Sequence, residues 1–259
     1  VAADYRLWSR NPKELYDSNV RGTENVCKLV SKYNKTLIYT SSVATLGIDD
    51  ENESNENTPV TFKDMLGDYK KSKYLAENIV LRFYRKKKIK CIIVNPSTPI
   101  GPGDIKPTPT GKIIYDVLNG RMPAYVDTGL NLVHVDDVAE GHFLALKYGS
   151  FGDKYILGGE NLHFKEFLDL ITEYGNKPKI SLELNPKFLI PFAYLNELFH
   201  RFFINATPSL TVDGLNMSKK KMFFSSSKAK KKLRYRPRTV KNAIKESVEW
   251  FSKYKSWSW

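Results

Sequence analysis

The sequence predicts an α/β protein, in which a doubly wound parallel sheet is accompanied by a small, mostly helical lobe. Two short runs rich in β-branched residues, "KTLIYTSS" and "KCIIVNPS", are separated by one long helical pattern. From about residue 160 onward, helical patterns dominate without strands at a regular spacing. Strand, helix and strand in this order make a right-handed crossover unit, which is the building block of such a sheet.

The elements of the first half can be justified in chain order. Residues 12–33 place apolar side chains at helical spacing with a proline near the start, and therefore predict a helix. The apolar runs at 35–42 and 90–97 end in small polar residues and predict buried parallel strands. The pattern at 69–87 predicts a long helix with an apolar side made of Leu75, Ile79, Val80 and Phe83.

The second half begins with a loop rich in proline and glycine at 95–111. We expect a helix at about 111–119, a short strand in "NLVHVDD" and a strand in "DKYILGG". Further helices are predicted in "VAEGHFLALKYG", "FKEFLDLITEYG", "FLIPFAYLNELFHRFF" and "TVKNAIKESVEWFSKY". Asp136 or Asp137 could cap the first of these helices. His134 is expected to be structural rather than a base, and no metal site is predicted because nothing nearby completes one.

Composition excludes several classes of protein. A chain of 259 residues with 41% apolar residues can bury a substantial core, and it contains no run of apolar residues long enough to span a membrane. The net charge of +13 could indicate a polyanionic partner, but the lysines form short surface-like runs without a nucleic-acid motif, so no nucleic acid is expected. Cys27 and Cys91 are too few for a disulfide framework, which favours a cytoplasmic location, and we expect no signal peptide.

The stretch "GDYKKSKYLAE" raises the question of catalysis. Tyr69 and Lys73 lie four residues apart and should share one face of a helix, where an ammonium group would lower the pKa of the phenol. Ser41 or Ser42 should face the same crevice, because ligands of parallel sheets bind beyond the carboxyl ends of the strands. The pair alone is a weak signal, since it could be a solvated stripe on a basic helix.

The order of strand, Thr-Ser-Ser, helix with Tyr-x-x-x-Lys, strand and Asn-Pro is much more specific. Together with "LYDSNVRGTENV", "YTSSVATLG" and "NLVHVDDVAEGHFLAL", it resembles the extended short-chain dehydrogenase/reductase family of NAD-dependent epimerases, dehydratases and reductases. Longer segments, such as "VNPSTPIGPGDIKPTPTGK" and "GRMPAYVDTGLNLVHVDDVAEGH", resemble hopanoid-associated sugar epimerases, which are relatives of dihydroflavonol reductases.

The resemblance implies hydride transfer at a substrate alcohol or carbonyl, with NAD or NADP as cofactor. Tyr69 would be the general acid/base, Lys73 would bind the nicotinamide ribose, and Ser42 would hold the substrate oxygen. Asn19 would maintain the hydrogen bonds of the active site. The further expected contacts with cofactor are Pro96, Ser97 and Ser41, and those with substrate are Asn95 and Thr98.

Two departures from the family pattern qualify this interpretation. The sequence has no Gly-x-x-Gly-x-x-Gly turn, so we expect an amino-terminally truncated chain whose Rossmann-like part lacks its first strands and binds cofactor poorly. Leu130 stands where nucleotide-sugar epimerases commonly have an arginine, which leaves a reductase of a more apolar molecule equally compatible. The expected substrate is a sugar, or a lipid-linked or terpenoid carbonyl or alcohol.

The expected division of the chain follows the resemblance. Residues 1–100, with 131–158 returning to them, should form the remaining Rossmann-like part, and 101–130 with 159–259 the substrate lobe. Residues 186–204 predict a packed lobe helix or a weak contact with a membrane surface. A homodimer is compatible with the sequence. The alternative to an enzyme is a non-catalytic basic binding module on the same scaffold.

Overall fold

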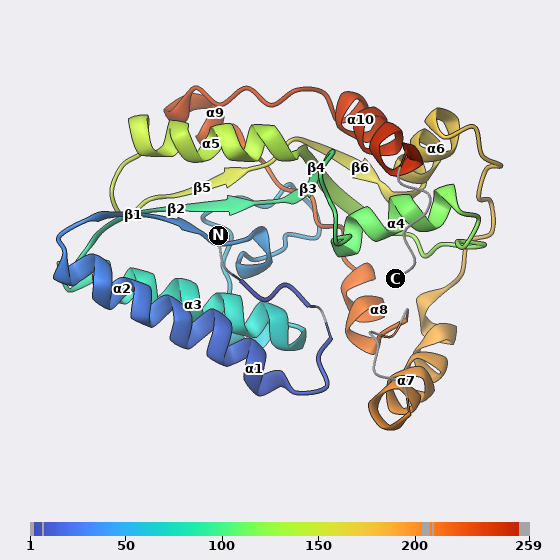
Figure 1. Ribbon diagram of the computed structural model, residues 1–259, viewed down its shortest axis with the longest axis horizontal. Helices are drawn as coiled ribbons and strands as arrows, with labels where there is room; N and C mark the ends of the chain where they lie inside the picture. The colour runs from blue at the N-terminus through green and yellow to red at the C-terminus, as the bar shows by residue number, and fades with distance from the viewer. Residues whose placement is uncertain (1–2, 7, 204–207, 209, 254–259) are drawn as a thin grey trace.

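The computed structural model describes residues 3–6, 8–203, 208 and 210–253 (Figure 1). Residues 1–2 and 7 of the expected Rossmann-like part lie outside these ranges. So do residues 204–207, 209 and 254–259 of the expected lobe, including Ile204 and Tyr254.

The main sheet contains both strands predicted for the first crossover unit. Its three parallel strands lie in the order β1 (Thr36–Thr40), β2 (Lys90–Pro96) and β5 (Lys154–Leu157). Thr40 at the end of β1 pairs with Val94, and Pro96 at the end of β2 pairs with Leu157. The central strand β2 is buried from Cys91 to Pro96, as a parallel strand covered on both faces must be.

Helices cover both faces of this sheet, which confirms the predicted doubly wound α/β class. On one face lie α2 (Gly22–Lys32) and α3 (Gly67–Arg85), and on the other lie α5 (Val135–Tyr148) and α9 (Ser227–Leu233) (Figure 1). Cys27, Val80 and Ile93 belong to the core between the sheet and the first pair. Ile92, Val94 and Leu157 face the second pair. The alternating side chains of β2 therefore feed two cores.

The helix predicted at 12–33 is interrupted by a wider turn. It consists of α1 (Pro12–Tyr16), the π-helical segment η1 (Asp17–Arg21) and α2. The amide of Gly22 donates to the carbonyl of Asp17, five residues earlier, which is the spacing of a π-helix. This turn holds Asn19, which is buried.

The lobe is mostly helical, as predicted, but it also contains a small sheet that the sequence patterns did not reveal. Its strands are β3 (Thr98–Ile100), β4 (Gly129–His134) and β6 (Glu160–His163), with β4 parallel to β3 and antiparallel to β6. Around its core pack α4 (Pro109–Leu118), α6 (Phe164–Tyr174) and α10 (Val240–Lys253). Of the segment expected to return to the main sheet, α5 and β5 do so, whereas β4 belongs to this second sheet.

Two further helices lie apart from that core. α7 (Pro186–Phe202) packs against α8 (Val212–Ser218), and both stand at the lower right of the molecule (Figure 1). Short 3₁₀ segments, η2 (Val43–Thr45) and η3 (Phe62–Asp64), lie in the connection from β1 to α3.

The predicted cap of α5 was wrong. The ring of His134, not Asp136 or Asp137, accepts the amide hydrogen of Asp136 at the start of the helix, at 3.0 Å. His134 is 1% exposed and its other ring nitrogen contacts Glu246, so it is structural, as expected. Asp137 instead accepts from the backbone and side chain of Arg238.

Candidate active site

Helix α3 brings a row of ionisable side chains to the sheet. Tyr69, Lys73 and Glu77 lie four residues apart and therefore follow one another along one face of the helix. The helix begins at Gly67, whose φ of +75° is a conformation that favours glycine. A side chain at Gly67 would also meet the carboxylate of Asp213, since an added Cβ would lie 2.7 Å from Oδ2.

The structure places Ser42 near Tyr69. Ser42 follows β1 and caps η2, where its hydroxyl accepts the amide hydrogen of Ala44 at 3.1 Å. The same side chain also acts on the Tyr69 phenol as a hydrogen-bonding neighbour, which lowers the pKa of the phenol. A phenol and a hydroxyl thus meet beyond the carboxyl end of β1, which is where an α/β sheet binds its ligands.

The pKa of Tyr69 corrects one expectation. Burial raises the pKa of the phenol above its ordinary value, and the hydrogen bond with Ser42 lowers it only in part. The Lys73 ammonium does not act on the phenol as predicted, because it is directed elsewhere: it donates to the carbonyl of Thr40 at 3.0 Å and lies 5.4 Å from the centre of the Tyr39 ring. Burial lowers the pKa of Lys73 to about 8, against the opposing charge of Glu77.

Asn19 supports the backbone under Tyr69 rather than the reacting side chains. Its amide oxygen accepts from the amide of Asp4, and its nitrogen donates to the Asp4 carbonyl, each at 2.8 Å. The same nitrogen donates to the Ser72 hydroxyl at 3.0 Å, and Ser72 in turn donates to the carbonyl of Tyr69 at 2.8 Å. Asn19 therefore ties the amino-terminal segment to the first turn of α3.

Glu77, which was not predicted from the sequence, collects the hydrogen bonds behind the site. The Ser41 hydroxyl donates to Oε2 of Glu77 at 2.5 Å, the Thr45 hydroxyl at 2.8 Å and the Asn95 amide at 3.0 Å. Lys154 forms an ion pair with the other carboxylate oxygen. The hydroxyl of Ser41 is thus already used, which argues against the predicted contact between this side chain and the cofactor. The available signal was spacing, since Glu77 repeats the four-residue interval of Tyr69 and Lys73.

The end of β2 carries unsatisfied polar atoms. Among the described residues, Oδ1 of Asn95 and Oγ of Ser97 are buried without a hydrogen-bond partner. Such atoms are rare in folded proteins and call for a partner. The nitrogen of Asn95 donates to the Ser42 carbonyl at 3.0 Å, so these atoms border the site. The neighbouring predicted contacts, Pro96 and Thr98, lie in β2 and β3 on either side of Ser97.

These groups fit a nicotinamide cofactor. Oδ1 of Asn95 can accept a hydrogen bond, and Oγ of Ser97 can donate or accept one, which suits the amide and hydroxyl groups of a nicotinamide nucleoside. The ammonium group of Lys73, which lies beside Thr40 at the end of β1, can donate hydrogen bonds to ribose hydroxyls. Within the described ranges, no three His, Cys, Asp or Glu side chains are grouped so that they could hold a metal ion. None of the helices described is long and apolar enough to cross a membrane.

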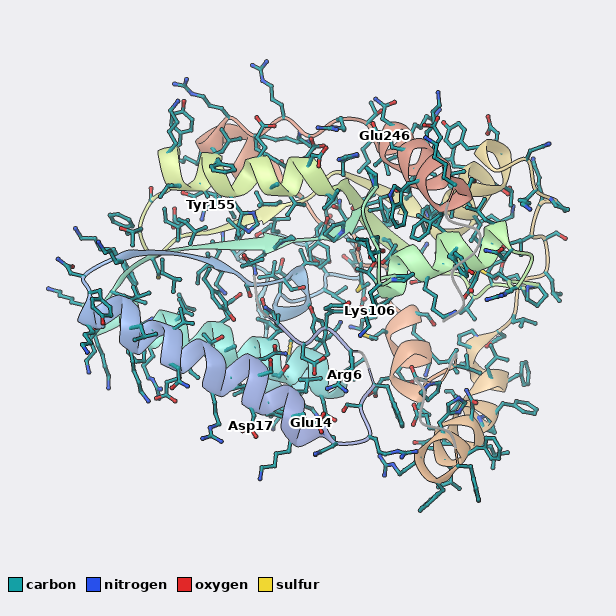
Figure 2. The ribbon with its side chains drawn as sticks, in the orientation of Figure 1. Arg6, Glu14, Asp17, Lys106, Tyr155 and Glu246 are labelled. Carbon is teal, nitrogen blue, oxygen red and sulfur yellow. The ribbon has the colours of Figure 1, made fainter. Side chains whose placement is uncertain are left out.

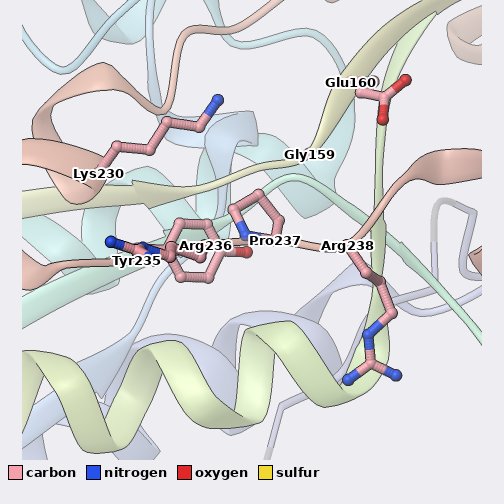
Figure 3. Close-up of a pocket in the computed structure, with 7 residues that line it drawn as sticks. All are labelled: Gly159, Glu160, Lys230, Tyr235, Arg236, Pro237 and Arg238. Atoms are coloured by element: carbon pink, nitrogen blue, oxygen red, sulfur yellow. The ribbon is translucent and has the colours of Figure 1, made fainter.

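A separate pocket of about 350 Å³ is lined by basic residues but does not contain this site (Figure 3). Its cations diverge, because Arg238 points toward α5, where it contacts Asp137, while Arg236 extends to the left, away from Arg238 (Figure 3). The pocket therefore offers no convergent set of charges for the phosphates of a dinucleotide.

The chain is similar in sequence and in fold to known proteins. A Synechocystis protein provisionally assigned as a dihydroflavonol 4-reductase is 40% identical over 98% of this chain and 75% of its own length. Sterol demethylase protein B of Methylococcus capsulatus is 28% identical over 97% of this chain and 77% of its own length. The crystal structure of gox2253 superposes with a TM-score of 0.86 at 47% identity, covering 100% of this chain and 78% of that one.

A UDP-glucuronic acid 4-epimerase of Bacillus cereus, solved with NAD, shares the fold with a TM-score of 0.76 at 14% identity, over 98% of this chain and 74% of its own. The profile of the NAD dependent epimerase/dehydratase family matches residues 2–158, which include all the candidate site residues. The chain belongs to the NAD-dependent epimerase/dehydratase family of enzymes.

Proposed function

We propose that this protein transfers hydride between a nicotinamide cofactor, NAD or NADP, and a substrate alcohol or carbonyl, and that its site is built around Tyr69 and Ser42. The observation that carries the proposal is that the Ser42 side chain acts on the Tyr69 phenol beyond the end of β1. The rival role of a non-catalytic binding module is not favoured, because the family consists of enzymes.

Each residue of the site has a separate proposed role in the reduction of a carbonyl. The cofactor, when bound, supplies or accepts the hydride. Ser42 and Tyr69 would both contact the substrate oxygen, and Tyr69 would transfer its proton to that oxygen as the adjacent carbon gains hydride. Because burial raises the pKa of Tyr69, the phenol is protonated at neutral pH and is suited to act as the acid. Lys73 would bind the ribose, and Ser97 and Pro96 would border the nicotinamide.

The substrate we propose is a ketone or alcohol on a largely apolar molecule, of the kind found in hopanoid and related terpenoid pathways. Leu130 supports it, because this residue lies in β4 where nucleotide-sugar epimerases commonly have an arginine, and it packs against the core of the lobe. Relatives named as sterol demethylase protein B and as 3β-hydroxysteroid-dehydrogenase/decarboxylase point to the same class of substrate. Asn95 and Thr98 are the proposed contacts with the substrate.

We further propose that these 259 residues alone bind the dinucleotide weakly, because they contain no glycine-rich turn of the family pattern. The cytoplasm is the proposed compartment, which the two buried free thiols of Cys27 and Cys91 support. Fluorescence titration with NADH and NADPH measures the affinity of this chain for the dinucleotide. Tight binding would contradict the proposal that these residues alone bind it weakly.

A second partner is suggested by α7. Phe188, Phe192, Leu195, Phe199 and Phe202 recur at intervals of three and four residues, and each is more than half exposed. The exposed cations Lys187 and Arg201 lie near the two ends of this apolar stripe. We propose that the stripe contacts an anionic membrane surface, for which the net charge of +13 is favourable.

The decisive experiment is hydride transfer by the protein at its full natural length, compared with Tyr69→Phe. A panel of sterol-like and sugar ketones would be reduced with NADH and NADPH while absorbance at the nicotinamide band is followed. We expect Tyr69→Phe to lower kcat/KM by about 100-fold or more. Tyr74→Phe, a change one turn later on α3, serves as the matched control and should retain activity. Full activity in Tyr69→Phe would refute the proposed general acid.

A further inference from the structure

Glu77 is a buried carboxylate that the proposed chemistry does not use. It is 3% exposed, and four donors surround its two oxygens. Burial of a charged group is costly unless the group is paired and hydrogen-bonded. This complete set of donors therefore indicates a defined role for the charge.

The donors come from separate elements that meet at the site. Ser41 follows β1, Thr45 belongs to η2, Asn95 lies near the end of β2, and Lys154 begins β5. Glu77 itself lies on α3, two turns after Tyr69. One carboxylate therefore connects the catalytic helix to each strand of the main sheet.

Two of these donors also hold the backbone of Ser42. The Thr45 hydroxyl contacts the Ser42 carbonyl at 2.8 Å, and the Asn95 amide does so at 3.0 Å. The Asn95 amide has two hydrogens and can donate to Glu77, at 3.0 Å, as well as to Ser42, whereas Thr45 shares its single hydroxyl hydrogen between the Ser42 carbonyl and Glu77, at 2.8 Å from each. The carboxylate is thus two hydrogen bonds away from the residue whose hydroxyl meets Tyr69.

We propose that Glu77 is a positioning residue that holds Ser42 in the orientation in which its hydroxyl bonds Tyr69. This inference rests on the proposed function for the meaning of that contact, although the contact itself can be observed without any reaction. The charge of Glu77 has a second effect, because it opposes the fall in the pKa of Lys73 that burial causes.

A purely structural role for Glu77 predicts a loss of stability and nothing more. The matched control is Asp137→Asn, since Asp137 is also a buried carboxylate that is paired with a cation, Arg238, and lies outside the site. The two variants should each be less stable than the parent protein. Only Glu77→Gln should change the surroundings of the Tyr69 hydroxyl.

The readout is the NMR signal of the Tyr69 ring carbon that bears the hydroxyl, which responds to hydrogen bonding there. It is measured at neutral pH in protein labelled on tyrosine and is assigned by its loss in Tyr69→Phe. We expect this signal in Glu77→Gln to move from its parent position toward its position in Ser42→Ala. In Asp137→Asn it should stay at the parent position. A folded Glu77→Gln variant with an unmoved signal would overturn the proposal.

Thr45→Val keeps the test decisive if Glu77→Gln does not fold, because it removes one link between Glu77 and Ser42 with little change in shape. The Tyr69 signal should then move in the same direction by a smaller amount, and an unmoved signal in folded Thr45→Val would equally refute the proposal.

In active protein, Ser42→Ala should lower kcat/KM by a smaller factor in the Glu77→Gln background than in the parent. An inactive parent with a moved Tyr69 signal would refute the proposed function and leave the positioning role supported.

Discussion

The ammonium group of Lys73 donates a hydrogen bond to the carbonyl of Thr40, at 3.0 Å. Thr40 is the last residue of β1, so this contact fixes the middle of the catalytic face of α3 at the carboxyl edge of the sheet. The lysine is 5% exposed and lies above the Tyr39 ring. The effect of burying this cation on the free energy of unfolding can therefore be measured.

Lys73 should make the stability of the protein depend on pH. Its pKa falls from 10.5 to about 8 on folding, so between these pH values the unfolded chain binds a proton that the folded protein releases. The free energy of unfolding should therefore rise with pH in this window, by up to about 3 kcal/mol from this group. Urea unfolding of the parent and of Lys73→Met, from pH 7 to pH 10, isolates the effect.

The difference in unfolding free energy between the parent and Lys73→Met should shift in favour of the parent as pH rises. Lys86→Met removes an exposed lysine next to the end of the same helix and controls for the loss of a charge. Parallel curves for the parent and Lys73→Met would show that the ammonium is not destabilised by burial.

Ser42 and Ser41 should separate chemistry from stability. Ser42→Ala removes the hydroxyl that meets Tyr69 and should lower kcat/KM by about 100-fold, as loss of a donor to a reacting oxygen does. Ser41→Ala removes one donor to Glu77 and should lower the unfolding free energy by about 1 kcal/mol while retaining most activity. Steady-state kinetics and urea unfolding of both variants decide. The reverse pattern would exchange the roles of the two serines.

The ion pair between Arg238 and Asp137 should hold the carboxyl-terminal part of the chain to α5. The arginine donates to Asp137 through its side chain at 2.9 Å and through its backbone at 2.8 Å. Arg238→Ala leaves a buried carboxylate with fewer partners and should lower the unfolding free energy by about 1–3 kcal/mol. Arg236→Ala, an exposed neighbour, should change it by less than about 0.5 kcal/mol. Equal losses in the two variants would show that the pair of Arg238 and Asp137 adds nothing to stability.

The apolar stripe on α7 should bind anionic vesicles. We expect the protein to sediment with vesicles containing phosphatidylglycerol, less so in high salt, and not with pure phosphatidylcholine. Phe192→Ser combined with Phe199→Ser should abolish sedimentation, because both rings are more than half exposed. A protein that stays in the supernatant but elutes as a dimer, and as a monomer after the same changes, would assign the stripe to self-association instead.

The positions of the candidate site residues could be predicted from the sequence because these residues lie at recognisable places relative to their elements. Ser42 lies two residues after the end of a strand, and Tyr69 and Lys73 repeat on one helical face, so local patterns are sufficient to bring them to one edge of the sheet. Glu77 could not be assigned in this way. Its partners Asn95 and Lys154 lie 18 and 77 positions away, and only the three-dimensional pairing of β1, β2 and β5 collects them.

The sequence also could not predict where the side chain of Lys73 points, or that the lobe contains a second sheet. Helical spacing places Lys73 beside Tyr69 but does not say where a long, flexible side chain ends, and here the Thr40 carbonyl captures it. The strand β6 is only four residues long and is defined by its antiparallel pairing with β4, not by any alternation of its own. Several charges that lie near one another in Figure 2, such as Arg6 and Glu14, likewise come together only through the fold.

The π-helical turn at Asp17–Arg21 has a consequence for how the amino-terminal helix tolerates change. A π turn amounts to one residue inserted into an α-helix, and each residue of an α-helix advances by about 100° around its axis. Deleting a single residue of this turn would let the chain run on as an uninterrupted α-helix. Asn19 and everything before it would then swing around the axis and leave Ser72, and the backbone of Tyr69 beneath it, without this support.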